Sequence, residues 1–186
     1  MTHSNTALRG SADASAIVAF WRDAGPERWF SKDVDFDTEF RTRFQDAHFA
    51  AARQQLDGWL PQPESALALI LLLDQYPRNA FRDTAHMFAT DGLALHYARL
   101  SLPHLDAIEP ALRNFVCLPF MHAESLPVQE ESVLLYRDRI PDSLHWAIEH
   151  RDIIARFGRF PHRNRLLGRD TSAPEQAFLD GGGFAG

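Results

Sequence analysis

Segments of helical length make up almost the whole chain, and this feature limits the possible folds more than any other. Pro, Gly and Asp separate the segments, and each segment carries apolar residues three or four positions apart. No segment shows the sustained two-residue alternation of a half-buried strand. The pattern predicts an all-α protein of about nine helices. We expect them at residues 13–24, 35–56, 64–75, 84–89, 91–100, 109–116, 127–139, 142–157 and 173–179.

The most apolar of these segments is the expected helix 64–75. Its apolar side chains, which include Leu67, Ile70 and Leu71, surround most of its circumference, so this helix should be deeply buried. We expect it to end before Pro77, because a proline disfavours helical backbone at the preceding residue. The longest unbroken apolar run, 66–73, is far shorter than the roughly 20 residues that a membrane span needs. The run therefore indicates a core helix.

The length and composition indicate one domain. The chain has 186 residues, of which 45% are hydrophobic, and this is enough to form a single packed core. Residues 1–12 are polar and are expected to form a flexible tail. The helical domain should span 13–180, and the glycine-rich residues 181–186 should form a second flexible tail.

Helices joined by short connections pack as hairpins, and a stack of hairpins forms either a bundle or a solenoid. Three segments carry a resemblance that bears on this choice: 72–79 (LLDQYPRN), 118–125 (LPFMHAES) and 150–164 (HRDIIARFGRFPHRN). With them, the chain resembles the bacterial domain-of-unknown-function family 924 over residues 17–178. The resemblance implies a tetratricopeptide-like α-α superhelix, and it assigns no catalytic or ligand-binding residue.

The charge and the cysteine content limit the compartment and the partners. A net charge of −6 argues against nucleic acid or an anionic membrane as the partner of the whole surface. The single cysteine, Cys117, cannot form an internal disulfide and lies in an apolar stretch, as expected in a reducing compartment. The N-terminal residues lack the apolar core of a secretory signal. We therefore expect a cytoplasmic protein.

Basic residues are concentrated near the C-terminus. Residues 151–169 contain six arginines and one acid, so this segment carries a charge of +5. Guanidinium groups bind carboxylates and phosphates in a bidentate manner, which predicts a groove for an anionic small molecule or an acidic peptide. The candidate ligand-binding residues are Arg78, Arg82, Arg151, Arg159, His162 and Arg163. Alternatively, these arginines pair within the chain with acids such as Asp74, Glu124 and Glu149.

Two of these arginines occur in similar surroundings. Residues 74–79 (DQYPRN) and 159–164 (RFPHRN) share an aromatic residue, a proline, an arginine and an asparagine in the same order. Two matches do not establish a repeat, and turn-forming chemistry explains them adequately. If the two segments lie close together in the fold, Arg78 and Arg82 would join the basic patch.

Histidines and one glutamate suggest a different function, an enzyme. His122, Glu124 and His150 are the candidate catalytic residues, and His86 and His162 complete the possible pocket. Such groups could act as acid and base, with a metal ion as an option, or His150 could be a satisfied core residue. Metal-binding motifs, phosphate-binding loops and nucleophile motifs are missing, so no cofactor and no metal site are predicted.

The sequence therefore favours a binding module with an Arg-rich groove over an enzyme with a His/Glu pocket. A structural dimer without a small ligand is a third alternative, and it would require a large apolar surface patch. The sequence specifies neither the ligand nor the oligomeric state.

Overall fold

The computed structural model describes residues 13–186, and these residues form helices and turns without any strand. The predicted tail at 1–12 lies outside the described residues. The helices are α1 (Ala14–Ala24), α2 (Pro26–Trp29), α3 (Val34–Ala52), α4 (Pro63–Ile70), α5 (Tyr76–Ala80), α6 (Asp91–Ser101), α7 (Arg113–Met121), α8 (Leu126–Arg139), α9 (Leu144–Phe157) and α10 (Ala173–Asp180). Since α4 and α5 belong to one continuous rod, residues 13–186 hold nine separate helices, which confirms the predicted all-α class.

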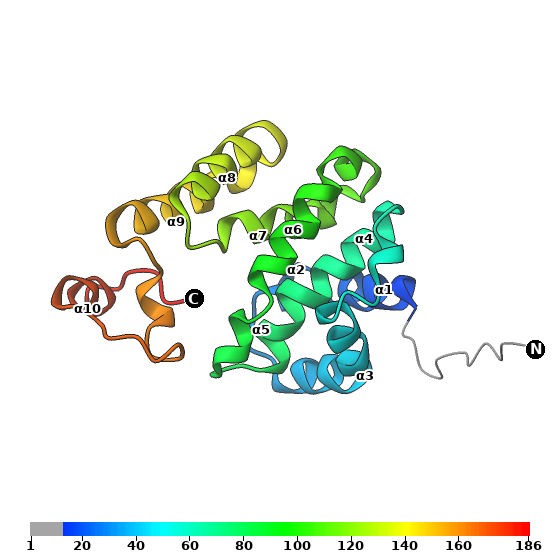
Figure 1. Cartoon of the computed structure of the whole chain (residues 1–186), viewed down its shortest axis with the longest axis horizontal. Coiled ribbons are helices and arrows are strands. Elements are labelled where there is room, and N and C mark those ends of the chain that lie inside the picture. Colours follow the sequence, from blue (N-terminus) through cyan, green and yellow to red (C-terminus); the bar gives the residue numbers. More distant parts are fainter. Residues whose placement is uncertain (1–12) are drawn as a thin grey trace, which may run out of the picture.

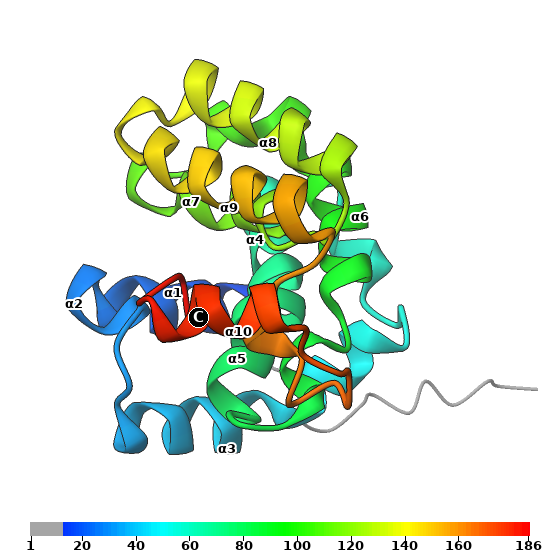
Figure 2. The same ribbon diagram turned by 90° about the vertical axis from the view of Figure 1, so that its left-hand side faces the viewer.

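The rod of α4 and α5 lies at the centre of the larger part of the molecule (Figure 1). The helix α1 packs against α4, and α3 packs against α5. From α6 onwards, each helix packs against the next one in the chain as far as α9. Figure 2 shows α8 and α9 together at one end of the molecule and α3 at the other. The predicted tetratricopeptide-like superhelix stays a prediction.

Aromatic rings join α1 and α3 to the rod. Phe40 of α3 is fully buried, and its ring lies 5.5 Å from that of Trp21 and 5.1 Å from that of Tyr76. Phe36 and Phe44 lie one helical turn on either side of Phe40, so a single face of α3 is buried. Edge-to-face and tilted contacts of this kind add to the stabilisation that comes from the buried area.

The central rod contradicts the prediction that the third helix ends before Pro77. Helical backbone continues through a π-turn, Leu71–Gln75, into α5, which contains Pro77. In the π-turn, the N–H of Tyr76 bonds the carbonyl of Leu71, five residues earlier. The extra residue in this turn accommodates the proline ring, which would clash with the carbonyl four residues before it in a regular α-helix. Local propensity is overridden because the segment is buried on all sides.

Side chains from other parts of the fold satisfy the carbonyls that the π-turn and Pro77 leave without helical donors. His48 of α3 donates Nδ1–H to the Leu72 carbonyl at 2.8 Å. Thr90 Oγ1 donates to the Leu73 carbonyl at 2.5 Å, because Pro77 has no N–H to offer it. Arg78 Nη1 donates to the Asp74 carbonyl at 2.6 Å. Two of these three consecutive carbonyls therefore depend on tertiary contacts, and the third bonds a side chain of the rod itself.

The C-terminal part is built around a smaller apolar cluster. Ile153, Ile154 and Phe160 are buried in it, and Phe178 of α10 packs against them. The glycine-rich segment 181–186, predicted as a flexible tail, folds back onto this cluster and places the Phe184 ring 4.4 Å from the ring of His150. Within residues 13–186, no helix has the length and apolarity to cross a membrane.

Replacing Thr90 with Val keeps the shape of the side chain and removes the donor to the Leu73 carbonyl. A buried acceptor left without a partner costs about 1–3 kcal/mol, so we expect T90V to lower the free energy of unfolding by that amount in urea denaturation. Thr42 provides the control, because its hydroxyl bonds the Thr38 carbonyl on an exposed helix face. T42V should change stability by less than about 0.5 kcal/mol, and equal effects of the two variants would contradict the role of Thr90.

Candidate functional site

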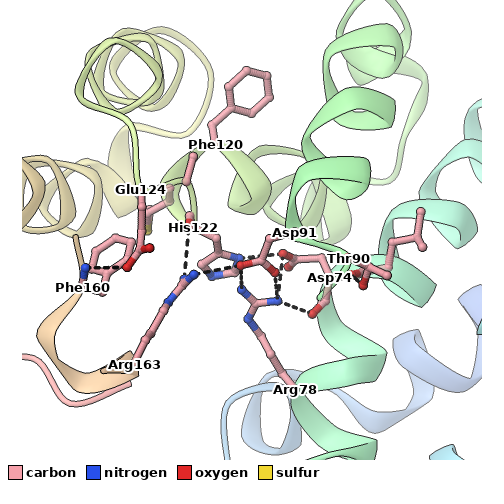
Figure 3. A network of polar contacts seen from close by, with 12 residues as sticks. Asp74, Arg78, Thr90, Asp91, Phe120, His122, Glu124, Phe160 and Arg163 are labelled. Atoms are coloured by element: carbon pink, nitrogen blue, oxygen red, sulfur yellow. Dashed lines mark hydrogen bonds and ion pairs between the residues drawn. The ribbon is translucent and has the colours of Figure 1, made fainter. Parts of the chain in front are cut away.

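A buried carboxylate in the π-turn is the centre of the most extensive polar network in the described residues (Figure 3). Asp74 is 0% exposed, and its carboxylate receives hydrogen bonds from His122 Nδ1 at 2.7 Å and from Gln75 Nε2 at 2.6 Å. Arg78 Nη1 lies 3.2 Å from the same carboxylate. Burial alone would raise the pKa of Asp74, but the charge of Arg78 and the bond from His122 outweigh it and hold this pKa far below its usual value. Asp74 is therefore ionised.

A second carboxylate joins two arginines that are distant in the sequence. Asp91 is the first residue of α6, where the helix dipole favours a negative charge. Its Oδ2 atom accepts a hydrogen bond from Arg78 Nη2 at 3.1 Å and another from Arg163 Nη1 at 2.9 Å. Arg78 and Arg163 are the arginines of the two similar sequence segments. The two segments therefore meet at one aspartate.

Arg163 holds the C-terminal part of the chain against the central rod. Arg163 is 6% exposed, and its guanidinium lies 4.5 Å from the ring centroid of Phe88 and 4.7 Å from that of Phe160. Besides the bond to Asp91, Nη2 donates to the His122 carbonyl at 3.0 Å. Planar stacking together with a fixed fork of donors is a role that lysine could not fill.

His122 has a defined tautomer. Because Asp74 is ionised and can only accept, Nδ1 of His122 carries the proton in this contact, and Nε2 has a free lone pair. Desolvation and the nearby charge of Arg78 lower the pKa of His122 despite the opposing effect of Asp74, so the ring is neutral at pH 7. Its side chain is 15% exposed, and no group within residues 13–186 forms a hydrogen bond with Nε2.

Phe160 is a meeting point for the remaining charged groups. Its N–H donates to Glu124 Oε1 at 2.8 Å, and its carbonyl accepts from Arg169 Nη2 at 3.3 Å. Glu124 and Arg169 also form a bidentate pair with distances of 2.7 and 2.9 Å. Burial opposes ionisation of Glu124, but its bonds to Arg169 and to the Phe160 amide lower its pKa. Glu124 is therefore occupied by structural partners.

The predicted Arg-rich groove is not supported, because the structure pairs its arginines with carboxylates of the same chain. Arg78 and Arg163 share Asp91. The other pairs are Arg82 with Asp37, Arg151 with Asp152 at 2.6 Å and Arg159 with Glu175 at 2.6 Å. Of the three acids named as alternative partners, Asp74 and Glu124 take part in such pairs as well, whereas Glu149 forms no ion pair with any described residue. Intramolecular pairing satisfies these guanidiniums at short range, so a ligand would have to compete with built-in carboxylates.

The predicted enzymatic residues divide into two groups. His86 lies apart from the others, where its Nε2 is 3.1 Å from Nε2 of His48 and its ring is 4.0 Å from that of Phe81. Glu124, His150 and His162 all contact Phe160, and His122 is linked to them through the bond from Arg163 to its carbonyl. His150 donates Nδ1–H to the Trp146 carbonyl at 2.9 Å, as expected of a satisfied core histidine.

His162 has no comparable partner. Its Nδ1 atom is buried without a hydrogen bond from any described residue, and its ring lies 5.7 Å from that of Phe160. No group of three His, Cys, Asp or Glu side chains within residues 13–186 is arranged to hold a metal ion.

Two hollows on the described surface lie elsewhere, along α9 and α10. One, of about 480 Å³, is lined by Arg156, Phe157, Arg159, Ser172, Pro174 and Glu175. The other, of about 390 Å³, is lined by His145, Ile148, Glu149, Asp152, Ile153, Arg156, Phe157 and Phe178. Of the six predicted ligand-binding residues, Arg159 alone lines either of these two hollows. The sequence missed Arg156 as a candidate, although it lies in the basic segment, because charge counting does not show which arginines lack acid partners.

The fold and the network define an all-helical protein whose central rod carries a buried Asp–His pair and two arginines on one aspartate. The model of a family described as bacterial protein of unknown function (DUF924) matches residues 17–183, and the chain therefore belongs to this family. A solved structure of the protein of unknown function ATU0120 from Agrobacterium tumefaciens is similar, with 53% identity and a TM-score of 0.87. The match covers 90% of this chain and 97% of that one. No match was found among curated proteins.

Replacing Arg163 with Leu tests whether the ion pairs at Asp91 are structural. Removal of one partner of a buried pair leaves an uncompensated charge, so we expect R163L to lower the free energy of unfolding by about 3–5 kcal/mol. R165L is the matched control, because Arg165 and its partner Asp83 are 77% and 85% exposed and lie 3.7 Å apart. It should cost less than about 0.5 kcal/mol. A stable R163L variant would show that Arg163 is free for another role.

The buried histidines predict a loss of stability in mild acid. Burial lowers the pKa from 6.5 to about 4 for His48 and His150 and to about 3 for His162. Below pH 6.5 the unfolded chain takes up protons that the folded chain cannot, so the stability present above pH 6.5 is lost as the pH falls. Each histidine contributes about 1.4 kcal/mol per pH unit.

Urea denaturation between pH 7 and pH 4.5 measures this decline. Asp and Glu begin to titrate in unfolded chains only towards the lower end of this window, and the comparison with a histidine variant isolates the contribution of one ring. H150Q removes one titrating group and should make the decline shallower by about 1.4 kcal/mol per pH unit. A wild-type stability that stays constant over this window would contradict the burial of these rings.

Proposed function

We propose that the protein is a helical binding module that takes an acidic peptide in the groove along α9 and α10. The two hollows share Arg156 and Phe157, so they adjoin each other and together make up the proposed groove. Grooves between packed helices are common sites for extended ligands. The groove is open at the surface, which suits a peptide better than an enclosed small molecule.

The basic end of the groove supplies the recognition of a carboxylate. Arg156 is exposed and has no carboxylate partner within residues 13–186. Its guanidinium is held 4.6 Å from the ring centroid of Phe157 and 5.9 Å from that of Phe178, which orients its donors without using them. This free and oriented guanidinium is the observation that carries the proposal.

The rest of the groove selects for more than charge. Ile153, Phe157 and Phe178 supply apolar surface next to Arg156, so a peptide with an apolar side chain beside its acidic one would fit. Glu175 neutralises Arg159 and completes the capping box of α10, which limits the positive charge at this end to about one unit. Glu149 and Asp152 line the other hollow, so only the surface beside Arg156 attracts an acid. The groove therefore favours a peptide with a single well-placed acid over a polyanion.

The arginines that carried the original prediction contribute less to this function. Arg78, Arg82, Arg151 and Arg163 are engaged by Asp91, Asp37 and Asp152. Release of a buried arginine from its carboxylate would cost more than a surface ligand returns. Arg159 stays a candidate because it lines the groove and is one-third exposed. The enzyme with a His/Glu pocket stays a prediction.

Replacing Arg156 with Gln tests the proposal. With a peptide that contains adjacent Glu and Phe residues as the probe, we expect R156Q to weaken binding at least about tenfold in isothermal titration calorimetry. R137Q is the control, since Arg137 is exposed, is paired with Asp138 and lines neither hollow.

Two further comparisons sharpen the result. E175Q keeps a capping side chain at α10 but frees Arg159, so it should strengthen binding of the same peptide. If R156Q and R137Q weaken binding equally, or if wild-type protein does not bind the probe, the groove is not the binding site.

A further inference from the structure

We infer that Nε2 of His122 is a built-in hydrogen-bond acceptor for the hydroxyl group of an uncharged ligand, with Asp74 as its positioning residue. This second site lies at the end of α7 and does not depend on the groove along α9 and α10. The inference rests on how rigidly the fold holds this one ring, on its free nitrogen and on the charge balance around it.

The backbone around His122 is held at every carbonyl of one turn. The amide of Gln129, a fully buried residue, donates to the carbonyls of Met121 at 2.6 Å and of Ala123 at 2.8 Å. It also lies 3.5 Å from the carbonyl of Phe120. The His122 carbonyl accepts from Arg163, as described above. Four successive carbonyls therefore have side-chain donors, and His122 cannot move without breaking buried bonds.

The ring itself is fixed by a carboxylate that is equally constrained. Asp74 binds Nδ1 and belongs to the π-turn, whose position depends on His48, Thr90 and Arg78. A π-turn in a helix costs stability and is found frequently at functional sites. An ionised aspartate on Nδ1 makes Nε2 a better acceptor and would stabilise the imidazolium if the ring took up a proton. Nε2 of His122 is therefore the ring nitrogen that is available to accept a hydrogen bond.

The balance of charge indicates the class of ligand. Asp74 and Asp91 together compensate Arg78 and Arg163, so the surroundings of His122 carry no net charge to attract an anion or a cation. Arg163 Nε is also without a hydrogen-bond partner among the described residues, but it is fully buried, so a ligand would reach only Nε2 of His122. One free acceptor within a neutral cluster suits the hydroxyl group of an uncharged molecule such as a polyol.

The first experiment measures the accessibility and the tautomer of His122 in the wild-type full chain. Diethyl pyrocarbonate reacts with neutral, accessible imidazole nitrogens, and peptide mass spectrometry identifies each modified histidine. We expect His122 to react, although more slowly than the exposed His96 and His145. We also expect ¹⁵N NMR to show a proton on Nδ1 and none on Nε2. Absence of reaction at His122, or a proton on Nε2, would overturn the inference.

The pH dependence tests the positioning role of Asp74. The reaction of His122 should have a midpoint below pH 6.5 in wild-type protein, because the lowered pKa keeps the ring neutral. D74N should shift this midpoint and slow the reaction at least about threefold, and E39Q, which alters an exposed pair with Arg43, should do neither. The charged or titratable groups that face His122 are Asp74, Arg78, Asp91, His150, His162 and Arg163. If the D74N variant does not fold, the tautomer of His122 measured by ¹⁵N NMR in the wild-type protein decides whether the inference holds.

Ligand class is tested with glycerol and inorganic phosphate as probes. Glycerol should shift the ¹⁵N resonance of His122 Nε2, and phosphate at equal ionic strength should not. A shift with phosphate alone, or with neither probe, would overturn the assignment to an uncharged hydroxyl ligand. Because R156Q leaves this site intact, the same titration in that variant separates failure here from failure of the groove.

Discussion

A proline within a fully buried helix is the constraint on which the rest of this structure depends. Pro77 cannot donate to the carbonyl of Leu73, and the π-turn that accommodates its ring leaves further carbonyls without helical partners. In a core without water, each such carbonyl must find a donor elsewhere. The donors come from His48 on α3, from Thr90 before α6 and from Arg78 within the rod. Both α3 and the segment before α6 are thereby fixed to one turn of helix.

The same turn organises the charged network. The backbone that carries the orphaned carbonyl of Asp74 also carries its buried side chain, which fixes Arg78 and His122. Arg78 then shares Asp91 with Arg163, and Arg163 joins the segment after α9 to the central rod. Buried ion pairs add little net stability compared with apolar packing, but the loss of one partner is very destabilising. The main role of the network is therefore to specify how the segment after α9 packs against the central rod.

This use of the arginines has a consequence for function. A basic segment of +5 suggests an anion-binding surface when only the sequence is considered. In the folded chain, most of that positive charge is neutralised by ion pairs with Asp91, Glu124, Asp152 and Glu175. The guanidinium of Arg156 and the groove beside it stay available to bind a partner. Family membership and the similar solved structure establish the fold, and the site geometry alone supports the proposed ligand.

The sequence by itself determined the helical class, the approximate positions of most helices and the burial of the segment 64–75, because these depend on local periodicity and composition. It also brought out the two similar segments and named Asp74 and Glu124 as internal partners. Only the tertiary structure decided that the helix continues through Pro77 and that Arg78 and Arg163 meet at Asp91. It also decided that His86 lies apart from His122. The physical reason is that orphaned carbonyls and buried charges are satisfied by groups far away in the chain, and local sequence does not encode those distances.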